Sequence, residues 1–185
     1  MNKKIILVLI SSLLAGCVAA VVVGAAGLVV YDRRSVFTIE NDARIFYQVN
    51  KNIAGDPQFK GSHIVISSFN QSVLLVGEVP TTYLKDEAAK IAKTTPNVYR
   101  VYNQISIENP TTIAQRSKDT WITGQVRAEM LTKKGLESGS IRVVTENSVV
   151  YLLGIVTKEQ SGLAVDVARQ VPGVTKVVKV FRYIM

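Results

Sequence analysis

The second half of this 185-residue chain repeats the first. Six residues recur 77 positions further along, and the pairs are Asp42 and Asp119, Ile45 and Ile122, Gln48 and Gln125, Val49 and Val126, Asn70 and Asn147, and Gly77 and Gly154. After a contraction of one residue, the pairs continue as Ala88 and Ala164, Pro96 and Pro172, and Val101 and Val177. A recurrence at a fixed distance indicates a repeated structural unit. We therefore expect two small modules, at residues 41–108 and 118–185, joined by a linker at 109–117.

Each module opens with the periodicity of a helix. Apolar residues recur every four positions, as Ile45, Val49 and Ile53 in the first copy and as Ile122, Val126 and Met130 in the second. This spacing puts them on one face of a helix and predicts a buried stripe. An aspartate stands shortly before each stripe, so Asp42 and Asp119 are predicted to be the N-caps of the two helices.

The rest of each module predicts a hairpin, a helix and a further strand. β-Rich runs separated by short polar turns pair as 63–68 with 73–79, and as 141–145 with 149–156. Thr157 and Gln160 have capping-box spacing and open a second helix, matched by 81–93 in the first copy. Pro96 and Pro172 follow these helices, and the last strands are 98–107 and 174–183. The predicted fold class is α+β, with the order α-β-β-α-β twice and both helices of a module packed on one face of a three-stranded mixed sheet.

The first residues have the pattern of a lipoprotein signal peptide. A basic start and an apolar run lead to Leu13-Leu14-Ala15-Gly16-Cys17, which has the form of a lipobox. In a lipobox the cysteine receives a diacylglycerol and the chain is cleaved before it, so 1–16 is the predicted signal peptide and 17–40 the acylated N-terminus and tether. Each buried acyl CH₂ contributes about 0.8 kcal/mol, and two or three chains therefore hold the protein at a membrane. Val18, where an aspartate would favour inner-membrane retention, predicts an outer-membrane location facing the periplasm.

The region after Cys17 suits a membrane surface. Val18 to Val30 is apolar, but its 13 residues fall short of the roughly 20 that span a bilayer as a helix. Arg33 and Arg34 follow and would suit anionic headgroups. The formal charge of +8 becomes +6 when Lys3 and Lys4 leave with the signal peptide (8 − 2). A basic surface fits anionic lipid, nucleic acid or cell-wall polymer, and export makes nucleic acid the least suited partner.

No group of residues has the pattern of a catalytic site. His63 is the only histidine and stands at a predicted strand start, so neither a catalytic triad nor a histidine-based metal site has partners. Cys17 is the only cysteine, and its sulfur is used by the lipid. The acidic residues are scattered, and no glycine-rich phosphate loop is present. We therefore predict a non-enzymatic protein without a cofactor or a bound metal.

The module order resembles the BON domain in two further details, which are the glycine at the end of the second strand (Gly77 and Gly154) and the Pro-x-Val turn into the last strand. A lipobox followed by two such modules, with the run Asp119-Thr120-Trp121-Ile122-Thr123, resembles the dual-BON-domain outer-membrane lipoprotein family. The resemblance implies a non-enzymatic protein that supports outer-membrane integrity at the division site. It also implies that the first helix of the second module binds anionic phospholipids such as phosphatidylglycerol and cardiolipin.

That helix carries apolar residues beyond its core stripe. A second stripe, a quarter to a third of a turn away, has Trp121, Gly124, Ala128 and Leu131 where the first copy has Arg44, Tyr47, Lys51 and Ala54. Tryptophan favours the bilayer interface, and each nearby basic side chain adds about 1 kcal/mol at an anionic leaflet. The predicted phospholipid-binding residues are Trp121, Gly124, Arg127, Ala128, Leu131, Lys133 and Lys134. Because glycine weakens a helix, Gly124 also suggests close approach by another group.

Two other roles for the second stripe stay open. Trp121 and Leu131 could pack against the other module or the linker. Alternatively, they bind an envelope protein, such as a regulator of cell-wall hydrolysis, and the chain acts as an adaptor. Since the first helix of the first module lacks the second stripe, we expect that module to brace the second and not to bind lipid alone.

Overall fold

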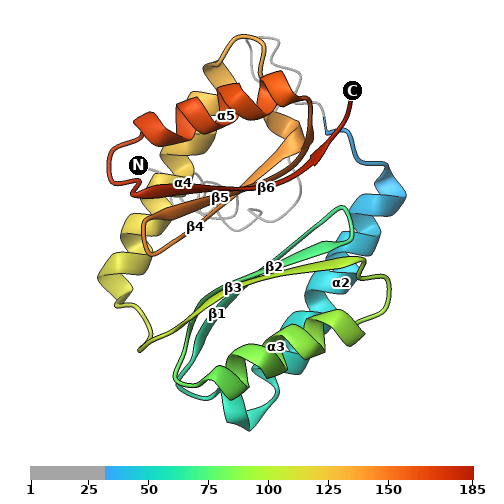
Figure 1. Ribbon diagram of the computed structural model, residues 1–185, viewed down its shortest axis with the longest axis vertical. Helices are drawn as coiled ribbons and strands as arrows, with labels where there is room; N and C mark the ends of the chain where they lie inside the picture. Colours follow the sequence, from blue (N-terminus) through green and yellow to red (C-terminus); the bar gives the residue numbers. More distant parts are fainter. Residues whose placement is uncertain (1–31) are drawn as a thin grey trace, which may run out of the picture.

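The computed structural model describes residues 32–185. The predicted signal peptide, Cys17 and most of the predicted tether lie outside these residues. Within them, the two modules have the same order of elements (Figure 1). The first contains α2 (Val36–Ala54), the 3-10 helix η1 (Pro57–Phe59), β1 (His63–Phe69), β2 (Ser72–Val79), α3 (Thr82–Thr94) and β3 (Arg100–Ile107). The second contains α4 (Ile113–Thr132), η2 (Ser138–Ser140), β4 (Ile141–Glu146), β5 (Val149–Val156), α5 (Lys158–Gln170) and β6 (Lys176–Tyr183).

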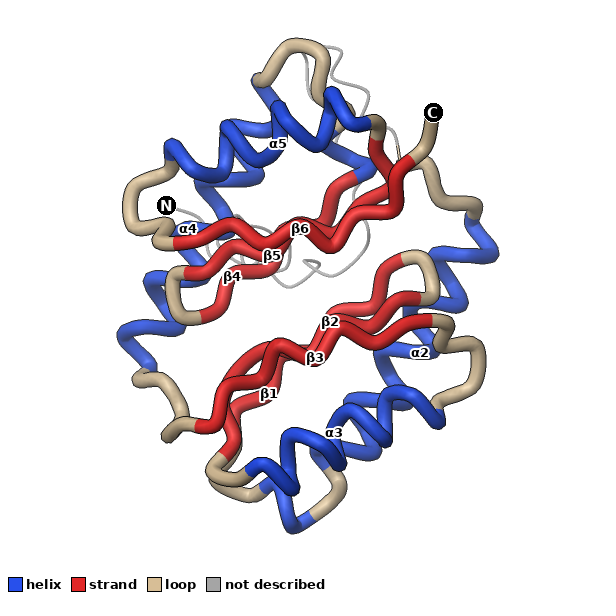
Figure 2. Tube along the Cα trace, in the orientation of Figure 1, coloured by secondary structure: helices blue, strands red, loops and turns tan. Residues whose placement is uncertain are grey.

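Each sheet has three strands, and the middle strand pairs with both others. β2 runs antiparallel to β1 and parallel to β3. In the second sheet, β5 runs antiparallel to β4 and parallel to β6. Two helices cover one face of each sheet and form a core with it (Figure 2). The buried residues of these cores include both predicted helical stripes, Ile45, Val49 and Ile53, and Ile122, Val126 and Met130. The predicted α+β fold and the α-β-β-α-β order are confirmed.

Both first helices begin earlier than the sequence predicted. α2 starts after Ser35 and α4 after Thr112, and each hydroxyl accepts a backbone N–H of the first helical turn, at 3.1 and 3.2 Å. The prediction that Asp42 and Asp119 are the N-caps is therefore wrong. Residues 113–117, which we expected in the linker, belong to α4.

The two aspartates bind hairpin turns instead. The Asp42 carboxylate accepts both backbone N–H groups of the β1–β2 turn, at 2.7 and 2.8 Å. The Asp119 carboxylate accepts both backbone N–H groups of the β4–β5 turn, at 2.9 and 2.8 Å. Positive φ angles of 48° to 63°, typical of two-residue type I′ loops, occur at the turn residues Asn70, Gln71, Asn147 and Ser148. Each aspartate thus ties its helix to the hairpin of its own module.

The two sheets face each other across the middle of the molecule, with the helices on the outside (Figures 1 and 2). A third apolar core lies between them, and its buried residues are Phe69, Leu74, Val76, Tyr151, Leu153 and Val180. β1 and β4 contact each other. α2 packs mainly over β1 and α4 over β4, whereas α3 and α5 pack over the opposite strands, β3 and β6. Consequently, α2 and α4 flank the same edge of the stacked sheets.

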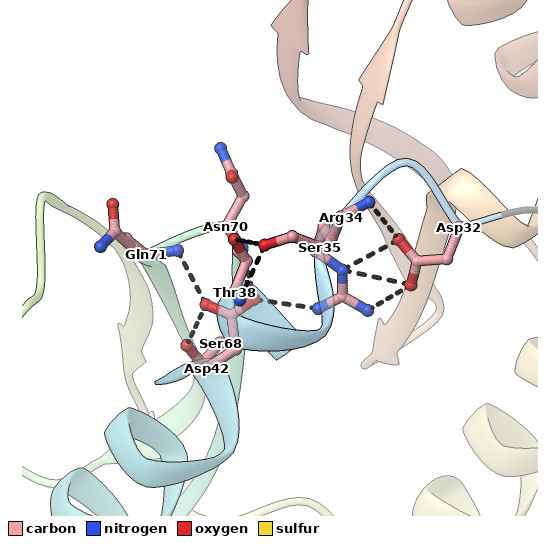
Figure 3. A network of polar contacts seen from close by, with 8 residues as sticks. All are labelled: Asp32, Arg34, Ser35, Thr38, Asp42, Ser68, Asn70 and Gln71. Atoms are coloured by element: carbon pink, nitrogen blue, oxygen red, sulfur yellow. Dashed lines mark hydrogen bonds and ion pairs between the residues drawn. The ribbon is translucent and has the colours of Figure 1, made fainter. Parts of the chain in front are cut away.

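The segment before α2 links the two modules. Arg33 donates to Glu137 of the second module at 2.8 Å. Arg34 donates to Asp42 of the first module at 2.9 Å (Figure 3). The Arg34 guanidinium also lies 4.0 Å from the centre of the Phe69 ring. Both arginines are paired within the protein, so they serve the fold rather than the lipid headgroups that the sequence suggested.

Candidate functional site

Helix α4 exposes an apolar stripe on the side away from its core. The α4 stripe consists of Trp121, Gly124, Ala128 and Leu131. Trp121 is 51% exposed and Leu131 is 42% exposed, and the two small residues between them are exposed as well. Neither the other module nor the linker covers the stripe, so packing among residues 32–185 does not account for its large side chains.

The α4 stripe and the core stripe lie on opposite sides of the helix. At about 100° per residue, the mean directions of the two stripes differ by roughly half a turn. The expected separation of a quarter to a third of a turn is too small for the two stripes as a whole. It holds only for Trp121 and Ile122, which lie at the adjoining edges of the two stripes. The core of the module therefore makes no use of the α4 stripe.

Gly124 lies in the middle of the stripe with open space beside it. A Cβ atom built at this position meets no atom within 4 Å. The close approach that this glycine suggested therefore does not occur among the described residues. With Ala128, it leaves a strip of small side chains between two large ones.

The three basic residues of the predicted site have different surroundings. The Arg127 guanidinium donates to the Val143 carbonyl of β4 at 3.1 Å, so it contributes to the fold. Lys133 and Lys134 follow the end of α4 and line a groove of about 390 Å³ between α4 and α5. The structure thus brings the four residues of the α4 stripe together and places the positive charges at its margin.

The first module carries exposed apolar residues that the sequence comparison missed. At the positions equivalent to the α4 stripe, the exposed residues are Arg44, Tyr47, Lys51 and Ala54. Because α2 begins at Val36, however, the helix also presents apolar residues before these positions. The exposed large apolar residues of α2 are Val36, Phe37, Ile39, Phe46 and Tyr47. The spacing of Val36, Ile39, Ala43 and Phe46 is the signal that could have revealed them.

The single histidine lies between the modules. His63 begins β1, as predicted, and its Nε2 is 3.3 Å from the Glu146 carboxylate of β4. Burial lowers the pKa of His63, and the positive charge of Arg116 lowers it further. Among residues 32–185, no cluster of three or more His, Cys, Asp or Glu side chains could hold a metal ion. Within the same range, no helix is long and apolar enough to cross a bilayer.

Comparison with known proteins matches both modules to one family. The BON domain matches residues 41–109 and 118–185. Over its whole length the chain is 37% identical to the "Outer membrane lipoprotein DolP" of Haemophilus influenzae, of which it covers 97%. It is 33% identical to the "21 kDa hemolysin" of Actinobacillus pleuropneumoniae, over 83% of this chain and 79% of that protein. It is 26% identical to "Osmotically-inducible protein Y" of Escherichia coli, over 74% of this chain and 70% of that protein.

Proposed function

The chain belongs to the BON-domain family as an outer-membrane lipoprotein with two copies of the domain, and from this premise we propose that its second domain binds anionic phospholipid through α4. The lipids that fit are phosphatidylglycerol and cardiolipin. By binding lipid in the membrane that also holds its acyl chains, the protein supports outer-membrane integrity, and we propose the division site as its place of action. Its role is binding and organisation rather than catalysis.

The observation that carries the proposal is the exposure of the α4 stripe. Trp121 can lie in the bilayer interface, with its ring toward hydrocarbon and its N–H toward water. Leu131, ten residues on, provides a second apolar contact about 15 Å further along the helix. The small residues between them let the backbone approach the lipid. A helix lying in the plane of the interface would bury the whole stripe.

Electrostatics favours an anionic lipid over a neutral one. Lys133 and Lys134 are exposed at the end of α4. Each lysine near an anionic leaflet contributes about 1 kcal/mol, and salt screens this attraction. Binding to lipid should therefore weaken as ionic strength rises. An adaptor that bound a protein through the apolar residues Trp121 and Leu131 should depend little on salt.

The proposal is tested by co-sedimenting the fragment 32–185, which contains all of the described helices and strands, with vesicles. Vesicles of phosphatidylcholine are compared with vesicles rich in phosphatidylglycerol and cardiolipin. We expect the wild-type fragment to bind only the anionic vesicles. Trp121→Ala and Leu131→Glu should each weaken this binding about tenfold, with unchanged circular dichroism. Tyr83→Ala removes an exposed aromatic ring from α3 and is the matched control, which should bind like the wild type.

The outcomes separate the two candidate functions. No binding of the wild-type fragment to either kind of vesicle would contradict the lipid proposal and favour the protein adaptor. The division-site part is tested separately, with a fluorescent fusion of the full-length protein. We expect the fusion to gather at the septum, and an even distribution around the envelope would contradict that part alone.

A further inference from the structure

We propose that α2 of the first domain carries a second membrane-contacting surface, beside the point where the lipid tether joins the folded protein. This surface, the α2 face, consists of Val36, Phe37, Ile39, Phe46 and Tyr47. The inference rests on the proposed function in taking a lipid surface as the partner, but it concerns another helix in the other domain.

The α2 face is more exposed than packing of its own domain requires. Val36 is 83% exposed, Phe37 77% and Tyr47 66%, whereas the core stripe of the same helix is buried. Five of the thirteen exposed large apolar side chains of the described residues lie on this one helix. At about 100° per residue, all of these except Phe37 fall within an arc of roughly 100°. A concentration of this kind marks an interaction surface rather than scattered surface residues.

The position of the tether indicates a membrane as the partner of the α2 face. Cys17 and Asp32, the first described residue, are 15 residues apart (32 − 17). A chain of this length spans at most about 54 Å when fully extended. Asp32 stands four residues before the start of α2 (36 − 32). With Cys17 acylated, α2 is the helix of the described residues that lies nearest to the lipid anchor along the chain.

Ion pairs fix the tether between the two domains. Arg33 pairs with Glu137, in the loop after α4, and Arg34 pairs with Asp42 in α2. The first turn of α2 and the loop that follows α4 are therefore held at the same place. α2 and α4 lie near the same edge of the stacked sheets but cover opposite outer faces, so the α2 face is a lipid contact separate from the α4 stripe.

Charge at the border of the α2 face fits an anionic leaflet. Lys51 is exposed next to it and supplies the positive charge, whereas Arg44 is paired with the exposed Glu40 at 2.7 Å. A helix with an apolar face bordered by basic residues lies in the interface, while the aliphatic stems of the basic side chains reach out to the headgroups. This contact would replace our expectation that the first module serves only to brace the second.

The decisive test uses the acylated full-length protein in vesicles of phosphatidylcholine and phosphatidylglycerol, because the anchor then holds it at the bilayer whether or not α4 binds. The chain has one tryptophan, so Trp121→Phe combined with Phe46→Trp leaves a single reporter, at position 46 within the arc of the α2 face. We expect lipids with brominated acyl chains to quench its fluorescence roughly twofold. Trp121→Phe combined with Tyr83→Trp puts the reporter on α3 and is the unquenched control. Absence of quenching at position 46 would overturn the inference, whatever α4 does.

A second measurement separates this inference from the proposed function. In co-sedimentation of the fragment 32–185 with phosphatidylglycerol vesicles, Ile39→Glu with Phe46→Glu should weaken binding about tenfold, and Tyr83→Glu should not. Wild-type affinity in the α2 variant, together with loss in Trp121→Ala, would overturn the α2 face and leave the proposed function intact. Dimers in analytical ultracentrifugation that dissociate in the α2 variant would also overturn it, because a second copy would then cover this face.

Discussion

At the scale of single residues, the two buried aspartates differ most from expectation. Asp42 and Asp119 were predicted as N-caps, since an aspartate before an apolar run is typical of a helix start. Their carboxylates instead bind turns that are 28 and 29 residues away. Local spacing cannot reveal such a partner. The internal repeat could have revealed it, because Asn70 and Asn147 of the turns recur together with the aspartates.

Removing one of these carboxylates should destabilise its domain. Asp119 accepts from the N–H groups of Asn147 and Ser148 and, at 3.0 Å, from the Gln115 side chain. Asp119→Ala leaves these donors without a charged acceptor, so we expect the free energy of unfolding to fall by about 3 kcal/mol. Asp119→Asn keeps one acceptor oxygen and should cost about half as much. Urea denaturation followed by circular dichroism measures both, and a loss below about 1 kcal/mol for the alanine variant would contradict this role.

Gly124 allows an independent check of the exposed stripe. The residue lies inside a helix, and an added Cβ meets no atom within 4 Å. Gly124→Ala should therefore raise the free energy of unfolding by about 0.5–1 kcal/mol, because alanine is the better helix former. Thermal denaturation of the fragment 32–185 measures the change. A destabilised variant would mean that some group does approach Gly124 in solution.

At the scale of helices and strands, the sequence predicted the elements whose signals are local. Thr157 caps α5 by accepting a backbone N–H of its first turn at 3.2 Å, as the capping-box spacing indicated. The starts of α2 and α4 were missed because their first turns do not continue the core stripe. Val36 and Ile113 open these helices, and both are more than 80% exposed. For the same reason, the α2 face could not be recognised from the repeat alone.

The early start of α4 predicts that its apolar stripe can be extended. Ser117 is exposed, one turn before Trp121 and on the same face of the helix. Ser117→Leu should tighten binding to phosphatidylglycerol vesicles about threefold to tenfold, since one more apolar side chain would enter the interface. Ser117→Glu should weaken binding, because its charge opposes the anionic leaflet. Co-sedimentation compares the two, and equal affinities would contradict contact between this half of α4 and lipid.

At the scale of the whole molecule, the sequence predicted two modules but not how they meet. β2 is buried from Val73 to Val79, and β5 from Val150 to Gly154, although the helices cover only one face of each sheet. The other sheet buries the second face. A continuous apolar run, in place of alternation, is the sequence signal of a strand buried on both faces. We interpreted these runs only as strands of a hairpin, and therefore did not predict the contact between the two sheets.

Packing between the sheets should make the two domains unfold together. Leu74 is fully buried between the sheets and belongs to the first domain, whereas Trp121, the only tryptophan, belongs to the second. Leu74→Ala should lower the free energy of unfolding by about 2–4 kcal/mol. We expect the urea midpoint reported by Trp121 fluorescence to fall with it. Lys90→Ala, at the exposed surface of the first domain, is the control, and an unchanged midpoint in Leu74→Ala would mean that the domains unfold independently.

A buried polar cluster closes one end of the contact between the domains. Thr111 of the linker donates its backbone N–H to Glu78 at 3.1 Å, and its hydroxyl lies 3.4 Å from Glu146. Burial, together with the negative charges of Glu78 and Asp119, raises the pKa of Glu146 to about 7. His63 has a lowered pKa, so both members of the His63–Glu146 contact favour their uncharged forms. Protonation of Glu146 is therefore coupled to the packing of the two domains.

Ionisation of Glu146 should weaken the whole molecule as pH rises. With a folded pKa of about 7, against an ordinary value of 4.5, this carboxyl holds its proton more tightly when folded. Its contribution is complete below about pH 4.5 and is lost as pH rises through 7, so between about pH 5 and 8 the free energy of unfolding should fall by about 1–2 kcal/mol, allowing for solvent screening. Glu146→Gln stays neutral and should flatten this profile in urea denaturation, with Asp119 and Arg116 unchanged. His63→Gln removes the opposing titration of the histidine and should leave the fall in place. If Glu146→Gln lost stability as steeply as the wild type, the fall with pH would not arise from the Glu146 carboxyl.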